Sequence, residues 1–132
     1  MSAEGVNRKL RLLMRKSEDE QKAVENLINS GHYRIAISRC YFVVFYAASA
    51  LLAFHGKAFS KHSAVVSFFG KEFSAKDAQS KNMHRILLDL FDLRNDADYK
   101  LSEDPKEEDA RKQLALAVKF HDWVESQLPL SG

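Results

Sequence analysis

Residues 41–54, YFVVFYAASALLAF, form a run of 14 residues without a charged side chain. In the helix predicted for residues 32–56, apolar side chains cover nearly the whole circumference. A helix that is apolar all round must be surrounded by other parts of a protein or by lipid. Fourteen residues fall short of a bilayer span, and Arg39 lies just before the run. We therefore expect a buried central helix and no membrane span.

The rest of the chain repeats apolar residues at helical spacing on both sides of this segment. It shows no strand pattern, and it contains only five Gly and two Pro. A chain of 132 residues suits one domain with its own core. The sequence predicts a single all-α domain over residues 1–132, an antiparallel up-and-down bundle of about five helices. The expected helices cover residues 4–30, 32–56, 60–73, 82–99 and 105–128.

Polar stretches suggest where these helices begin, end or weaken. Gly31 and Gly56 follow the first two helices and tolerate the left-handed conformation that ends a helix. Ser17 to Gln21 is polar enough to be a solvated turn or a weak spot in the first helix, and residues 74–80 resemble a polar connection. Ser60 is a candidate cap for the third helix. Asp104 and Pro105 are expected to be the cap and first residue of the last one.

The amino-acid composition excludes some classes of protein but does not identify a function. Apolar residues make up 45% and charged residues 29% of the chain, which argues against a disordered chain and against a membrane protein. The net charge of +2 permits contact with nucleic acid but does not argue for it. A basic cluster near the N-terminus fits a solvated helix face better than a phosphate-binding strip. It consists of Arg8, Lys9, Arg11, Arg15 and Lys16.

Cysteine usage and the N-terminal sequence predict a cytoplasmic protein. The single cysteine, Cys40, cannot form an internal disulfide and lies in the most apolar segment. A reducing compartment follows most simply from this. Residues 1–15 mix Arg and Lys with apolar residues and lack the unbroken apolar run of a signal peptide.

Arg94 is the unusual residue of the fourth predicted helix. At 100° per residue it falls inside an apolar arc, between Leu87 and Leu90. Asp98 lies one turn further and could pair with Arg94, or it could neutralise Arg39 on the central helix, which we expect to be substantially buried. Together with Tyr41, these groups could also form a buried polar network that only fixes the register of the helices.

The same helix carries a second stripe, His84, Leu88, Phe91, Asn95 and Tyr99. A helix with two apolar stripes often packs on its own bundle and on a partner. We therefore expect a homodimer formed through the fourth helix. A monomeric mass in light scattering at micromolar concentration would count against it.

Four sequence segments together resemble the HEPN-domain family, in particular its small free-standing members. These segments are residues 38–42, 47–52, 61–63 and 94–99. The resemblance implies an all-α bundle that commonly dimerises. In many family members an arginine, followed several residues later by a histidine, lies in a cleft at the dimer interface and cleaves RNA.

The resemblance assigns roles to particular residues of this chain. Arg94 matches the catalytic arginine and Asn95 the polar residue that often follows it, whereas Tyr99 stands in place of the histidine. Tyrosine, with a pKa near ~10, moves protons poorly at neutral pH. His62, which follows Lys61 at the start of the third helix, could contact a phosphate, although a capping or surface role is more usual there. The expected ligand-binding residues are Arg94, Asn95, Asp98, Tyr99, Arg39 and His62.

Three functions are consistent with this set. The first is a module that binds RNA or nucleotides, the toxin-like partner of a minimal nucleotidyltransferase, as the resemblance implies; Tyr99 is then a conceivable target of the transferase. The second is a weak, metal-independent ribonuclease that recruits His62 or His84. The third is a purely structural interaction domain.

Metal and cofactor sites are not expected from the sequence. The five histidines show no His pair at helical spacing, and Cys40 is isolated. The chain also lacks a glycine-rich phosphate loop and a readable nucleophile–base pair. The sequence therefore predicts no bound metal and no cofactor.

Overall fold

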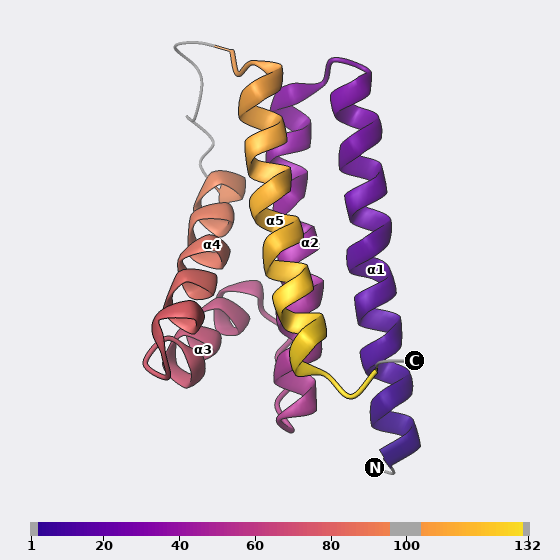
Figure 1. Ribbon diagram of the computed structural model, residues 1–132, viewed down its shortest axis with the longest axis vertical. Coiled ribbons are helices and arrows are strands. Elements are labelled where there is room, and N and C mark those ends of the chain that lie inside the picture. The colour runs from indigo at the N-terminus through magenta and orange to yellow at the C-terminus, as the bar shows by residue number, and fades with distance from the viewer. Residues whose placement is uncertain (1–2, 96–103, 131–132) are drawn as a thin grey trace.

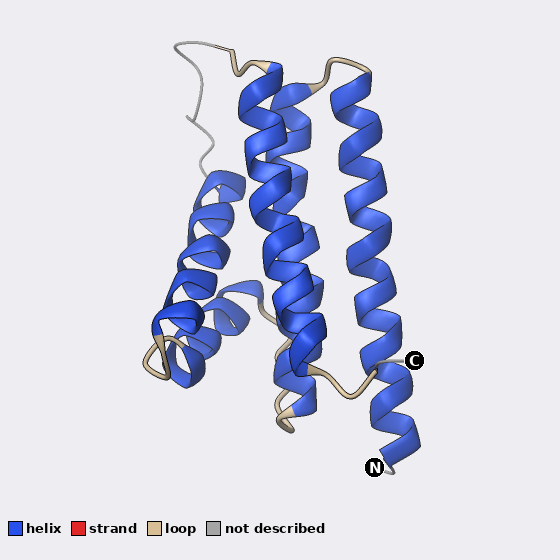
Figure 2. Cartoon of the chain, viewed as in Figure 1, coloured by secondary structure: helices blue, strands red, loops and turns tan. Residues whose placement is uncertain are grey.

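A computed structural model describes residues 3–95 and 104–130 of the chain. These residues form helices and loops, with no strand among them (Figure 2). The prediction of an all-α bundle of five helices is confirmed. The helices are α1 (Ala3–Asn29), α2 (Tyr33–Phe54), α3 (His62–Phe73), α4 (Ala78–Asn95) and α5 (Glu107–Gln127).

Helix α2 is the centre of the bundle. The long helices α1, α2 and α5 run side by side, while α3 and α4 form a corner beside α2 (Figure 1). Each of the other four helices packs against α2. Its length and composition would suit a membrane span, but most of that segment is buried inside the bundle, as expected for a core helix. Cys40 lies fully buried, and burial raises the pKa of its thiol to about 12.

Helix α1 runs unbroken through Ser17 to Gln21, so the predicted turn is wrong. Ser17 is fully buried, and its hydroxyl donates a hydrogen bond to the Val43 carbonyl of α2 at 2.7 Å. A buried hydroxyl costs little when it is paired, so it need not interrupt a helix. The inner face of α1 alternates steps of four and three residues through Leu10, Met14, Ser17, Gln21, Val24 and Ile28.

Side-chain caps move two helix starts away from the predicted positions. The backbone N–H of Ser80 donates to Asp77 Oδ1 at 2.7 Å, which starts α4 at Ala78 and shortens the predicted connection. This hydrogen bond lowers the pKa of Asp77. At α5, the backbone N–H of Lys106 donates to Asp109 at 2.8 Å, so the helix begins after Pro105.

The remaining predicted boundaries have mixed outcomes. Asp104 is not the cap of α5 and instead pairs with Arg34 at 2.6 Å. Helix α3 begins at His62 without a side-chain cap, so Ser60 is not its cap. Gly31 and Gly56 both have positive φ, 81° and 78°, as predicted for residues that end helices.

Gly70 allows α3 to approach α4 closely. A Cβ atom at this position would overlap His84 Nε2 of α4 and would lie 2.7 Å from its Cε1. The His84 ring is half-buried and lies parallel to the Phe69 ring, and burial lowers the pKa of His84. The second stripe of α4 is therefore partly covered by α3 of the same chain.

This contact predicts that Gly70→Ala changes the free energy of unfolding in opposite directions in the native chain and in a His84→Ala variant. In the native chain, Gly70→Ala forces the His84 ring to move; such overpacking costs about 1–3 kcal/mol, against about 1 kcal/mol gained in helix propensity. We expect a net loss of stability. In a His84→Ala background the same substitution should stabilise the fold by about 0.5–1 kcal/mol. Urea unfolding followed by circular dichroism measures both changes in the free energy of unfolding. If Gly70→Ala destabilises, or stabilises, the fold in both backgrounds, the contact between Gly70 and His84 is refuted.

Candidate functional site

Arg94 lies in the last turn of α4 and is exposed at the surface. Its guanidinium carbon is 5.4 Å from the centre of the Tyr41 ring and 5.3 Å from that of Phe42, both on α2. A guanidinium at this distance is attracted to the electron-rich face of an aromatic ring. The aromatic residues of α2 therefore help to fix a surface positive charge in place.

His62 is the first residue of α3 and lies beside the same rings. Its imidazole stacks on Phe45 with the centroids 4.0 Å apart, and its centroid is 5.6 Å from that of Tyr41. The Nδ1 atom is buried and makes no hydrogen bond within the part of the chain that the structure describes. Burial, and then the charge of Arg94, lower the pKa of His62. Its neutral form thus prevails at neutral pH.

The Tyr41 hydroxyl is a second unpaired polar group at this place. Tyr41 is fully buried, and its oxygen has no hydrogen-bond partner among the described residues. Burial raises the pKa of Tyr41, and the nearby charge of Arg94 opposes this only in part. The hydroxyl remains protonated and can donate a hydrogen bond.

Arg39 is paired with Glu20 of α1. Its Nε and Nη2 atoms donate to the two carboxylate oxygens at 2.7 and 2.6 Å. The hydrogen bond to Glu20 raises the pKa of Arg39. The expectation that Arg39 is substantially buried is wrong, because 42% of its side chain is exposed. Its guanidinium carbon also lies 4.3 Å from the Phe42 ring centre, so Arg39 and Arg94 share that ring.

The structure thus brings together three of the predicted site residues, Arg94, His62 and Arg39. Asn95 is the last residue of α4, while Asp98 and Tyr99 lie outside the described residues. His84 packs against Gly70, away from these rings, so His62 is the histidine that accompanies Arg94. Phe42 and Phe45 are half-buried and pack against the core, as expected for the central helix. Neither was a predicted site residue, and the place of Phe42 within the family-like segment 38–42 was the available signal.

We call Arg94, His62 and Phe42, which lie beside the buried Tyr41, the Arg94–His62 surface. A guanidinium binds phosphate oxygens through charge-assisted hydrogen bonds. A neutral imidazole can accept a proton. The arrangement suits an anionic ligand that carries a phosphate group.

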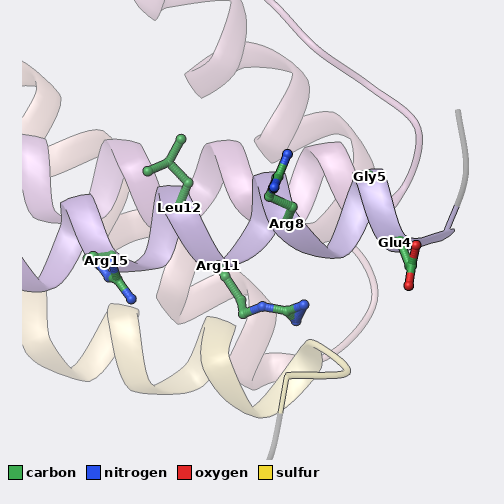
Figure 3. Close-up of a pocket in the computed structure, with 6 residues that line it drawn as sticks. All are labelled: Glu4, Gly5, Arg8, Arg11, Leu12 and Arg15. Carbon is green, nitrogen blue, oxygen red and sulfur yellow. The ribbon is translucent and has the colours of Figure 1, made fainter.

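The N-terminal basic cluster forms a separate stripe on α1. Arg8, Arg11 and Arg15 project from the helix around the exposed Leu12 (Figure 3). The shallow hollow between them is lined by α1 residues alone. Such a stripe matches the expected solvated face.

The proximity of Arg94 to His62 can be measured directly. Arg94→Gln removes the positive charge, so we expect the pKa of His62 to rise toward its ordinary value of about 6.5. Because the native pKa is depressed, the unfolded chain binds this proton more readily, and His62 weakens the fold as the pH falls below about 6.5. NMR titration of the imidazole reports the pKa. Arg85→Gln, which removes another exposed positive charge from the same helix, should leave the pKa of His62 unchanged; equal shifts in both variants would contradict the arrangement.

Comparison with known proteins agrees with this architecture. The family model described as HEPN domain matches residues 10–127. A Methanocaldococcus jannaschii protein named "Putative toxin MJ0142" is 35% identical over 107 residues, which cover 81% of this chain and 73% of that protein. A Thermotoga maritima "UPF0332 protein" is 31% identical over 99 residues, or 75% of each chain. "Putative toxin MJ0605" of M. jannaschii is 28% identical over 123 residues, covering 93% of this chain and 91% of that protein. The chain belongs to the HEPN domain family.

Proposed function

We propose that this chain is a toxin-like HEPN module that binds RNA or nucleotides at the Arg94–His62 surface. The observation that carries the proposal is the exposed Arg94 guanidinium held over the Tyr41 and Phe42 rings, with His62 beside it. Single-stranded RNA offers both a phosphate for the guanidinium and an unstacked base for aromatic surface. Two of the relatives carry toxin names, which supports the toxin-like part of the proposal.

The proposal includes a dimer and a protein partner. The half-buried Leu88 and Phe91 of α4 leave apolar surface for a second copy of the chain, which would bring two Arg94–His62 surfaces near one seam. The partner is a minimal nucleotidyltransferase acting as antitoxin in the cytoplasm, with Tyr99 as the residue it modifies. A neighbouring reading frame for such an enzyme would support this pairing.

Binding should depend on Arg94 and not on positive charge in general. Arg94→Ala removes a charge-assisted phosphate contact worth about 1.5–3 kcal/mol, so the Kd for a fluorescein-labelled single-stranded RNA should rise by roughly tenfold or more. The slope of the logarithm of the association constant against the logarithm of the salt concentration should decrease in magnitude by about one. Fluorescence anisotropy measures both, and circular dichroism verifies folding. Arg85→Ala is the matched control. If both variants lose the same RNA affinity, the loss reflects the lower net charge of the chain and not a specific contact of Arg94.

RNA cleavage is a second candidate, favoured by the lowered pKa of His62 next to Arg94. A neutral imidazole can take the proton of a ribose 2′-hydroxyl, whose oxygen then bonds to the adjacent phosphorus as the P–O5′ bond breaks, while Arg94 stabilises the developing negative charge. The products are a 2′,3′-cyclic phosphate and a 5′-hydroxyl, whose oxygen takes a proton from water.

If the chain cleaves RNA in the presence of EDTA, His62→Gln should reduce the rate by about 10²–10⁴-fold with little loss of binding. His84→Gln should leave the rate unchanged, because His84 packs elsewhere. A gel assay on labelled RNA gives the rates. If the native chain binds RNA without cleaving it, only the proposal of a binding module stands. If the His62→Gln variant still cleaves RNA at the native rate, His62 is not the general base.

A further inference from the structure

A second histidine, His121 of α5, is held in one orientation by buried hydrogen bonds. Only 4% of its side chain is exposed. Its Nδ1 atom lies 2.8 Å from Ser17 Oγ, and Ser17 Oγ lies 2.7 Å from the Val43 carbonyl oxygen. Three helices, α1, α2 and α5, therefore meet at this histidine.

The hydrogen bonds determine which nitrogen of His121 carries the proton. The Ser17 hydroxyl has one hydrogen and donates it to Val43, because the carbonyl can only accept. The same oxygen must then accept a hydrogen from His121 Nδ1. In the neutral imidazole, the Nε2 atom is left with a lone pair.

Among the described residues, two carboxylates lie near this nitrogen and no hydrogen-bond donor pairs with it. Glu18 Oε1 is 3.9 Å from Nε2 and Glu125 Oε2 is 3.8 Å from it, both beyond hydrogen-bond distance. Three acceptor atoms this close together repel one another unless a cation lies between them. The ring is almost fully buried and cannot turn away without breaking its bond to Ser17.

The spacing of the three atoms suits a divalent transition metal. All three ligand atoms lie within 4.8 Å of one another. A Zn²⁺ ion binds His nitrogen and carboxylate oxygen at about 2.0–2.2 Å, which separates tetrahedral ligands by about 3.4 Å. Glu18 and Glu125 are half-exposed at 50% and 55%, so small side-chain movements close the difference. Ser17 fixes the imidazole just as outer-shell hydrogen bonds fix metal-binding histidines.

We propose that Glu18, His121 and Glu125 bind one divalent transition-metal ion, with Zn²⁺ as the representative cation, and thereby tie α1 to α5. The imidazole favours such an ion over Mg²⁺, which prefers oxygen ligands. The exposed carboxylates give the ion a path from solvent and leave a coordination position for water. The site lies on helices other than α3 and α4 and does not depend on the proposed RNA-binding surface.

Metal binding can be tested on the metal-free chain with Zn²⁺ itself. Titration in competition with a chromophoric chelator should give one tight equivalent of Zn²⁺ per chain. Bound metal should also raise the melting temperature relative to the chain in EDTA, since it binds only the folded state, whereas equimolar Mg²⁺ should not. A native chain that binds no Zn²⁺ at micromolar concentration would overturn the proposal.

Variants locate the ion. The isosteric pair Glu18→Gln and Glu125→Gln, combined in one chain, should abolish both the tight equivalent and the rise in melting temperature. Glu108→Gln, an exposed glutamate of the same helix α5, should change neither. Ser17→Ala keeps all three ligands but frees the ring, so the affinity should fall by about 10–100-fold. Equal Zn²⁺ binding by the double variant would place the metal elsewhere and refute the site.

Discussion

Helix α2 is apolar around nearly its whole circumference and must be largely covered by protein, and this requirement explains the arrangement of the other helices. Two long helices, α1 and α5, cannot enclose it alone, so the shorter α3 and α4 close the remaining side. Alanines at Ala47, Ala48 and Ala50 add little bulk and keep the neighbouring backbones close. The start of α3 and the end of α4 are thereby brought against the same aromatic residues of α2. The Arg94–His62 surface forms at that junction.

Polar groups inside the bundle differ according to where they lie. Between α1, α2 and α5, Ser17 is paired with Val43 and His121. Among the described residues, the buried side-chain atoms without a partner belong to Gln21, Tyr41 and His62. Two of these three lie beside Arg94. An unpaired buried polar group costs about 1–3 kcal/mol, so the described part of the chain is less well satisfied beside Arg94 than at Ser17.

The fold could be predicted from the sequence because the uncharged run 41–54 and the helical periodicity depend only on local pattern. The errors arose where a polar residue points inward or a short hydrogen bond decides a boundary. Ser17 resembled a solvated position, although its spacing from Leu10 and Val24 placed it on the inner face. Arg39 had carboxylates available on several helices, and only the packing of α1 against α2 selects Glu20. His62 and Arg94 are far apart in sequence, so their proximity required the tertiary structure.

His62 and His121 have the same side chain, but the charges near each imidazole suit it to a different role. His62 lies near a guanidinium, so its environment disfavours a positive charge and keeps the imidazole available to accept a proton. His121 is oriented by Ser17 so that its free nitrogen faces two carboxylates, an environment that attracts a positive charge. A proton-accepting role therefore suits the first histidine and a cation-binding role the second. Because the two sites use different helices around α2, a substitution at one should leave the chemistry of the other intact.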